Sequence, residues 1–225
     1  MLGKATIVDL THTVSEQSAP SERSQPDVAG AAERQAQGET GPMRDLGTRF
    51  NAGGVLPNDQ RSVARVPSRE LLVSAVVVNI APRVARWPDY HVTVEDLQAW
   101  ERQNGRIPKR SAVLLNTGWS RRWADPGRYV NQGPQGVPQV PGFAPAAVAF
   151  LVGQRQVRGL GMDVFIPDQP MAGAGALALP LAPGVWHIEN LVNLDRLPAK
   201  GAKLVVAPLR VEAASAPARV LAILP

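Results

Sequence analysis

LLVSAVVVNI, residues 71–80, is the stretch of sequence that most strongly constrains the fold. It is almost continuously apolar and rich in β-branched residues, which is typical of a strand buried on both faces. Downstream, residues 92–104 have a helical pattern, with Thr93 as a candidate N-cap and Gly105 directly after the last turn. Residues 112–116 (AVLLN) are a second apolar stretch of strand length. This mixture of buried strands and a capped helix predicts an α/β fold.

The rest of the chain continues this mixture, with no change in composition that would mark a second domain. A helix is predicted at 145–153, where Pro145 stands at the start. Further strands are predicted at 5–9, 159–164, 186–191, 203–208 and 219–224. Residues 15–41 are polar, so we expect a long loop or arm there, with a short helix around 31–37. We therefore predict a single domain over residues 1–225.

Composition and charge restrict the function classes. Of the 225 residues, 44% are hydrophobic and 19% charged, and the absence of cysteine excludes disulfides and thiolate metal sites. The net charge is +5, but the basic residues are mostly single arginines with acidic residues between them, so we expect no nucleic-acid binding. No apolar run reaches the length of a membrane span, about 18 residues, and the opening MLGKATIVDL lacks the pattern of a secretory signal. We expect a cytoplasmic protein without membrane contact.

Seven segments that follow one another along the chain have a family character when they are taken together. They are VDLTHTVSE, SVARVPSRELLVSAVVVNI, HVTVEDLQAW, AVLLNTGWSRRW, VPGFAPAAVAFL, VRGLGMDVFIPDQ and the C-terminal WHIENLVNLDRLPAKGAKLVVAPLRVEAASAPARVLA. In this order the segments resemble the cyclase family, whose best-known members are bacterial kynurenine formamidases and which includes isatin hydrolases. The resemblance covers nearly the whole chain.

The resemblance implies a single-domain swivelling β/β/α fold, assembled as homodimers or homotetramers. It also implies an active site in which one or two divalent ions, often zinc or manganese, activate water against a small amide or lactam carbonyl. A divalent ion suits this chemistry because it brings the pKa of bound water near neutrality and polarises the carbonyl oxygen.

The segment RDLGTRFNAGG, residues 44–54, aligns with the family's metal-binding motif H-x-G-T-H-x-D-x-P-x-H through Gly47 and Thr48. The motif's two ligand histidines, its ligand aspartate, its proline and its catalytic histidine then fall on Asp45, Arg49, Asn51, Gly53 and Val55, respectively. None of these residues is a histidine, so the motif has lost its nitrogen ligands.

The family's remaining ligands are a glutamate and a histidine twelve residues before it. Glu189 matches the glutamate, whereas Leu177 stands at the histidine position. The chain has three histidines, and none of them falls on a ligand position. Because zinc prefers nitrogen and sulfur ligands, and arginine cannot be a ligand, we predict neither a metal nor another cofactor.

The residues at the former metal site suggest a replacement for the ion. A buried carboxylate needs a compensating charge, so we predict that Arg49 pairs with Glu189 or Asp45. Arg49 would then polarise a substrate carbonyl, and Asp45 or Glu189 would act as acid or base. His187 shares the face of Glu189 if that segment is a strand, and together with Asn51 it is a candidate for substrate binding.

Three further polar residues have competing interpretations. Asp163 and Asp168 flank the predicted strand end GMDVFIPDQ, where α/β sites often gather, so both are candidate substrate-binding residues. A capping or turn role is at least as strong an interpretation for each of them. We expect His12 to satisfy backbone groups at a turn rather than to take part in catalysis.

Three functions remain open on this sequence. The first is a metal-independent enzyme that acts on a small carbonyl compound by cyclisation, dehydration, isomerisation or hydrolysis. The second is a catalytically inactive family member that serves as a ligand-binding or assembly subunit. The third is a conventional metal-dependent hydrolase whose ligands lie at other positions than this alignment assigns.

Overall fold

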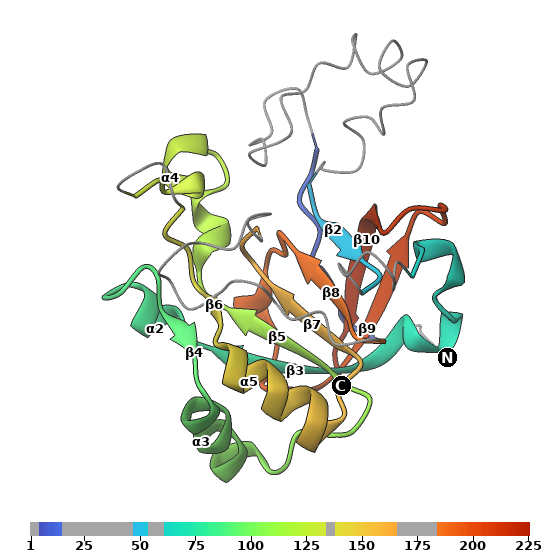
Figure 1. Ribbon diagram of the computed structural model, residues 1–225, viewed down its shortest axis with the longest axis horizontal. Helices are drawn as coiled ribbons and strands as arrows, with labels where there is room; N and C mark the ends of the chain where they lie inside the picture. Colours follow the sequence, from blue (N-terminus) through green and yellow to red (C-terminus); the bar gives the residue numbers. More distant parts are fainter. Residues whose placement is uncertain (1–4, 15–46, 54–60, 134–137, 166–183) are drawn as a thin grey trace, which may run out of the picture.

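The computed structural model describes residues 5–14, 47–53, 61–133, 138–165 and 184–225. This part of the chain has a mixed α/β architecture, in which helices cover one side of a large, strongly curved sheet (Figure 1). The predicted α/β class is confirmed. The predicted arm at 15–41 lies outside the described residues. Within the described part, no helix is both long and apolar enough to cross a membrane.

Eight strands form the main sheet among the described residues, in the order β1-β10-β2-β8-β7-β5-β3-β9. Their bounds are β1 Ile7–Asp9, β2 Arg49–Asn51, β3 Leu72–Asn79, β5 Ala112–Asn116, β7 Gly159–Met162, β8 Trp186–Glu189, β9 Lys200–Pro208 and β10 Ser215–Ile223. Strand β9 also pairs with β10, so seven of these strands close into a ring, and β1 pairs with β10 outside it. The sheet is therefore barrel-like. Strands β3, β5, β7 and β8 pair in parallel, and the other pairings of this sheet are antiparallel.

Helices and short turns connect and cover these strands. The helices are α2 Ala81–Val84, α3 Val94–Asn104, α4 Pro126–Val130 and α5 Pro145–Ala149, with a wider π-helical turn at Phe150–Gln154. Single 3₁₀ turns lie at Val63–Arg65, Ser68–Glu70, Trp119–Arg122 and Leu194–Arg196, and a small parallel sheet pairs β4 His91–Val92 with β6 Gly142–Phe143. The predicted strands and helices that fall on described residues match observed ones, with ends shifted by up to four residues. The helix predicted around 31–37 lies outside the described residues.

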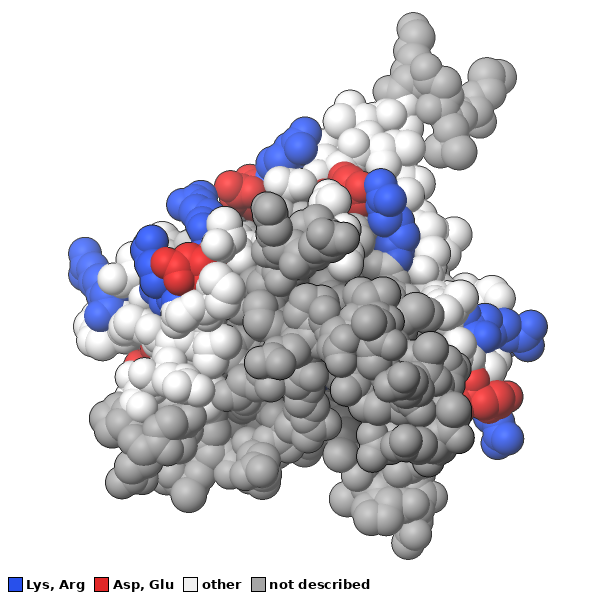
Figure 2. All heavy atoms as spheres, turned by 90° about the horizontal axis from the view of Figure 1, so that it is seen from above, with Lys and Arg blue, Asp and Glu red and all other residues white. Residues whose placement is uncertain are grey.

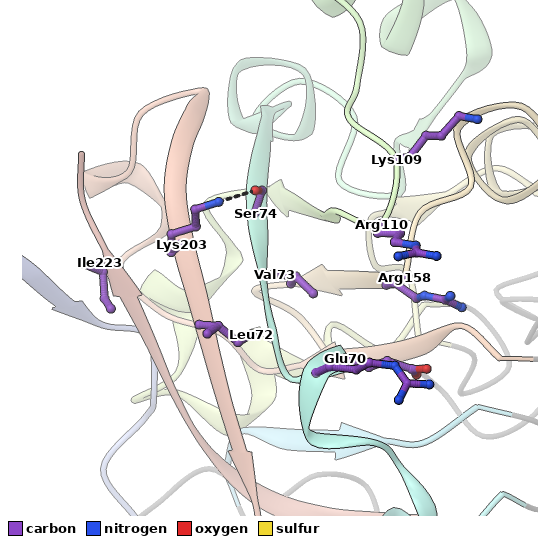
Figure 3. A pocket seen from close by; sticks show the side chains of 10 residues that line it. Glu70, Leu72, Val73, Ser74, Lys109, Arg110, Arg158, Lys203 and Ile223 are labelled. Carbon is purple, nitrogen blue, oxygen red and sulfur yellow. Dashed lines mark hydrogen bonds between the residues drawn. The ribbon is translucent and has the colours of Figure 1, made fainter.

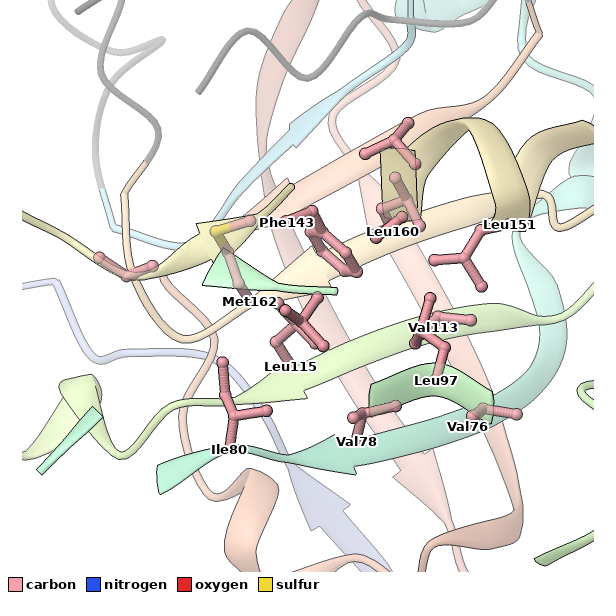
Figure 4. Packing of buried hydrophobic residues seen from close by; sticks show 14 of the residues in the cluster. Val76, Val78, Ile80, Leu97, Val113, Leu115, Phe143, Leu151, Leu160 and Met162 are labelled. Atoms are coloured by element: carbon pink, nitrogen blue, oxygen red, sulfur yellow. The ribbon is translucent and has the colours of Figure 1, made fainter. Parts of the chain in front are cut away.

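The sheet separates two hydrophobic cores, which explains the continuous apolar character of β3. Val73, Ala75 and Val77 belong to the cluster enclosed by the ring, whereas Val76 and Val78 belong to the cluster under the helices. Figure 4 shows this second cluster, with side chains of β3, β5 and β7 meeting those of α3 and of the turn that follows α5. The predicted burial of β3 on both faces is confirmed.

Helix α3 ends where the sequence predicts and begins at Val94, two residues after the predicted start and directly after the predicted cap Thr93. Thr93 accepts a hydrogen bond from the backbone N–H of Asp96, and the Asp96 side chain accepts one from the backbone N–H of Thr93. Gly105 ends the helix with φ 81°, a conformation that favours glycine. Trp100 anchors the helix to the sheet, because its Nε1 donates a 2.9 Å hydrogen bond to the carbonyl oxygen of Val77.

Gly159 allows the closest side-chain approach in the ring. A Cβ placed on this residue would lie 2.1 Å from the nearest ring carbon of Trp186, which is buried on the neighbouring strand. We therefore expect Gly159→Ala to lower the free energy of unfolding by about 1–3 kcal/mol, measured by urea denaturation. Gly153→Ala is the matched control, because a Cβ added there would meet no atom within 4 Å and alanine favours the helical turn. Equal stabilities of the two variants would contradict this packing account.

Candidate functional site

The antiparallel register of β2 and β8 builds the candidate site. Arg49 lies opposite Glu189, and Asn51 lies opposite His187. Residues directly opposite each other in a sheet point to the same face, so these four polar side chains gather on one side. The intervening Phe50 and Ile188 point into the core enclosed by the ring. The four polar side chains therefore lie on the outer face of the sheet.

Strand β2 is short, and its position is fixed by the glycines around it. Gly47 precedes it with φ 63° and Gly53 follows it with φ 98°. A Cβ on Gly53 would lie 2.5 Å from the carbonyl oxygen of Val185. The positive φ of Gly53 and the closeness of this oxygen therefore both require glycine. Because proline is restricted to φ near −65°, this path excludes the proline that the family motif has here.

Arg49 and Glu189 form an ion pair at the centre of this face. The Nε of Arg49 donates to Oε1 of Glu189, and Nδ2 of Asn51 donates to the same oxygen at 3.2 Å. The exposed fraction is 14% for the Arg49 side chain and 2% for that of Glu189. The predicted pairing of Arg49 with Glu189 is therefore observed, and the guanidinium compensates the buried carboxylate.

His187 is a neutral imidazole next to this pair. It is buried, and among the described residues its Nδ1 has no hydrogen-bond partner. Burial, followed by the positive charge of Arg49, lowers the pKa of His187 to about 3. The imidazole is consequently uncharged at neutral pH and can serve as a hydrogen-bond partner for an uncharged substrate group.

A buried acid lies at the end of β7. Oδ1 of Asp163 accepts hydrogen bonds from the backbone N–H and the hydroxyl of Thr117, at 2.9 and 2.6 Å. Its Oδ2 is buried and has no partner among the described residues. Burial raises the pKa of Asp163 despite the hydrogen bonds from Thr117. The proposed capping role is thus present on one oxygen, and the other oxygen is available to bind or carry a proton.

Asn190 ties the end of β8 to its surroundings. Its side chain accepts a 2.7 Å hydrogen bond from the Tyr129 hydroxyl and donates a 2.8 Å one to the carbonyl oxygen of Gly47. Its own carbonyl oxygen accepts a 2.6 Å hydrogen bond from Oγ1 of Thr48. Asn190 has φ 57°, so these contacts hold a strained backbone directly after Glu189. Asn190 is a positioning residue that the sequence interpretation missed.

Tyr129 connects the two buried acids electrostatically. Burial, and then the charges of Asp163 and Glu189, raise the pKa of Tyr129 well above its usual value. The hydroxyl therefore stays protonated and acts as a donor. Its sequence context, PGRYV in a short helix, gives no signal for this role.

His12 lies at the edge of this network. Its backbone N–H donates a 3.1 Å hydrogen bond to Oγ1 of Thr48, in accordance with the expected turn role. Its ring stacks on Trp123 with 4.0 Å between centroids, burial lowers its pKa to about 4, and Nε2 has no partner among the described residues. A neutral, partly buried imidazole is thus a second candidate acceptor that the sequence interpretation assigned to structure alone.

Two of the predicted site residues, Asp45 and Asp168, lie outside the described residues, as do Val55 and Leu177. The structure brings together Arg49, Asn51, His187 and Glu189, and it places Asp163 near the same tyrosine as Glu189.

The described donor set does not fit a divalent ion. The guanidinium of Arg49 sits on the carboxylate of Glu189, which is the family-type ligand that the chain retains. A cation at this carboxylate would be repelled by the arginine. Among the described residues, no group of three or more His, Asp or Glu side chains is arranged to hold a metal.

Known proteins resemble this chain over most of its length. Residues 8–169 match the model of the Cyclase family. An isatin hydrolase from Roseibium aggregatum is 33% identical over 164 residues, a match that covers 70% of this chain but 61% of that protein. The chain therefore matches less than two thirds of that relative's length.

Solved structures agree with this result. Isatin hydrolase A from Ralstonia solanacearum superposes with a TM-score of 0.80 at 30% identity, covering 99% of this chain and 93% of that one. Isatin hydrolase A from Labrenzia aggregata, bound to benzyl benzoate, superposes with a TM-score of 0.76 at 30% identity, covering 99% and 94%. The barrel-like sheet described above is thus an arrangement that these hydrolases share.

Proposed function

The chain belongs to the Cyclase family, and on that premise we propose that it is an enzyme acting on a small carbonyl compound at the Arg49–Glu189 site. The reaction is a cyclisation, dehydration or hydrolysis that proceeds without a divalent ion. The observation that carries this proposal is the ion pair itself, which puts a fixed positive charge at a former ligand position. The swivelling β/β/α arrangement and assembly as a homodimer or homotetramer belong to the same proposal.

Arg49 supplies the electrostatic part of the proposed reaction. When a nucleophile adds to a carbonyl carbon, negative charge develops on the carbonyl oxygen. A guanidinium held in place by Glu189 and the neighbouring strand stabilises that charge without reorganisation, which is the largest single effect in many enzymes. Glu189, to which Asn51 donates a hydrogen bond, orients the guanidinium, and His187 accepts a hydrogen bond from the substrate.

Asp163 is the residue that transfers the proton in the proposed reaction. Its Oδ2 has no hydrogen-bond partner among the described residues, and its raised pKa moves it towards the range in which a carboxyl group exchanges protons efficiently. His187, with a pKa of about 3, is too weak a base for this step. In hydrolysis, the water oxygen adds to the carbonyl carbon, its proton passes to Asp163, and the same proton is returned to the leaving nitrogen or oxygen.

The test of the function is turnover of small carbonyl probes in chelator-treated buffer. Isatin, a cyclic amide, is the first probe because the relatives are isatin hydrolases. We expect turnover by the wild type and a loss of about 100-fold in Arg49→Met, the usual effect of removing an oxyanion donor. Arg121→Met, which removes an exposed arginine paired with Asp195, is the matched control and should keep full activity. Probe binding without turnover would support the inactive, ligand-binding alternative instead.

Metal addition gives an independent prediction. Because Arg49 occupies the carboxylate that would bind an ion, we expect zinc or manganese to leave the melting temperature unchanged, and purified protein to contain less than one equivalent of metal. An ion that binds only the folded state raises the melting temperature by mass action. Stoichiometric metal together with such a rise would restore the conventional hydrolase and refute metal independence.

A further inference from the structure

A second pocket lies away from the candidate site and shares no residue with it. Its volume is about 640 Å³, and its lining comes from β3, β9 and β10 and from the turns before β3, β5 and β7. The pocket and the candidate site lie at opposite ends of the parallel strands. Asp163 and Asn190 follow the carboxyl ends of β7 and β8, whereas Arg110 and Arg158 precede the amino ends of β5 and β7. A pocket of this size accommodates a small molecule.

Five basic residues line this pocket: Arg69, Lys109, Arg110, Arg158 and Lys203. Figure 3 shows Arg110 and Arg158 on one wall and Lys203 on the other, next to Ser74, to which it donates a 2.9 Å hydrogen bond. Glu70, the one acid among the described residues of the lining, is already paired with Arg61 at 2.9 Å. Within the described part of the chain, none of the five basic side chains forms an ion pair.

The pocket gathers these five basic side chains around one cavity. On the face seen in Figure 2, acidic side chains lie beside basic ones. Elsewhere Arg83, Arg155 and Arg219 each form an ion pair with a carboxylate. A cavity wall with five basic side chains and one acid that is already paired attracts anions from solution, because the wall focuses the field.

The backbone at Arg110 supports a ligand role. Arg110 has φ 60°, which is an uncommon and strained conformation for a non-glycine residue. Its backbone N–H donates to the carbonyl oxygen of Gln156, and the backbone N–H of Arg158 donates to that of Ser111, so the two turns are held together. Gln156 has a positive φ as well, at 52°, so both turns depart from the usual backbone conformation. Glycine at position 110 would relieve this strain but would lack the guanidinium.

We propose that this pocket binds a phosphorylated small molecule. Two arginines on one wall suit the doubly charged oxygens of a phosphate monoester, which guanidinium groups bind through paired hydrogen bonds. Leu72, which is 59% exposed, and Ile223 provide an apolar surface for the rest of the molecule. The pocket is a second ligand site and does not depend on the function proposed above.

The test is calorimetric titration of the full chain at low salt with naphthyl phosphate, inorganic phosphate and naphthalene sulfonamide. We expect one equivalent of naphthyl phosphate to bind, inorganic phosphate to bind at least tenfold more weakly, and the uncharged sulfonamide not to bind. Equal affinity for both phosphates would overturn the apolar part of the proposal and leave a simple phosphate site. Absence of phosphate ester binding would overturn the whole proposal.

Variants distinguish this pocket from general electrostatic attraction. The double variant Arg110→Gln/Arg158→Gln should bind naphthyl phosphate at least tenfold more weakly than the wild type. The double variant Arg86→Gln/Arg102→Gln changes the net charge equally at exposed positions outside the pocket, and it should bind like the wild type. Equal weakening in both double variants would refute the site.

The variant Arg110→Gly distinguishes loss of the site from misfolding, because misfolding would lower the stability of the protein and not raise it. Glycine relieves the left-handed strain and removes the guanidinium, so the urea midpoint should rise while affinity for naphthyl phosphate falls. Higher stability with unchanged affinity would show that Arg110 is not part of a site. If naphthyl phosphate bound only together with a change in oligomeric state, the face would be a subunit interface and the proposal would be wrong.

Discussion

Arg49→Met is expected to lower the free energy of unfolding by about 3–5 kcal/mol, the usual effect of removing one partner of a buried ion pair. The reason is that the Glu189 carboxylate, with a side-chain exposure of 2%, loses the cation that compensates it. Methionine has a similar length and keeps the packing of the arginine stem. Urea denaturation at neutral pH measures the effect.

A double-mutant cycle identifies the ion pair as the cause. Glu189→Gln removes the charge while preserving the shape, so Arg49→Met/Glu189→Gln should be more stable than the sum of the two single effects predicts. Arg121→Met provides the control, because its partner Asp195 is 52% exposed and exposed pairs contribute at most about 1 kcal/mol. A stability of Arg49→Met within about 1 kcal/mol of wild type would show that Glu189 does not depend on the guanidinium.

The parts of the fold that the sequence predicts well are those with a local signal. Short sequence segments contain these signals: the apolar run at 71–80, Thr93 as the cap of a helix, and Gly105 at its end. Strand β3 and helix α3 occur at these positions. Strand β2 is not predicted, since Arg49–Asn51 is a three-residue strand that pairs with β8 and β10 far along the chain. Closure of the ring between β9 and β10 likewise depends on pairings that no local pattern encodes.

The candidate site is predictable to the extent that it follows the family motif. The motif positions of Arg49 and Glu189 predict their pairing, although 140 residues separate them. The hydrogen bonds from Tyr129 to Asn190 and from Thr117 to Asp163 escape prediction, because they span 61 and 46 residues and use side chains without a motif. The unpaired Nε2 of His12 depends on its stacking with Trp123, which only the tertiary structure shows.

Acidification from pH 7 to pH 5 is expected to lower the free energy of unfolding by about 2–4 kcal/mol. In the folded protein the pKa is about 4 for His12 and about 3 for His187, against 6.5 for an unperturbed histidine. Between pH 6.5 and about 4 the unfolded chain therefore binds protons that the folded protein does not bind. The contribution of these two histidines to the free energy of unfolding is therefore complete only well above pH 6.5, and it decreases as the pH falls towards 4.

The two histidines with the largest lowering of pKa, His12 and His187, should account for most of the acid effect. Burial also lowers the pKa of His91, which adds to the effect in the same direction. His187→Asn and His12→Asn should each reduce the difference in stability between pH 7 and pH 5 by up to about half, even where the substitution also destabilises the protein at both pH values. Asp163 acts in the opposite direction, because its raised pKa lets the folded state take up a proton before the unfolded state does as the pH falls towards 4. The pH 7 to pH 5 interval separates the histidines from the carboxylates with lowered pKa, such as Glu101, whose contribution disappears only at more acidic pH. A difference between pH 7 and pH 5 that persists undiminished in the combined variant His12→Asn/His187→Asn would assign the acid sensitivity to other groups and remove the evidence that both imidazoles are neutral in the folded protein.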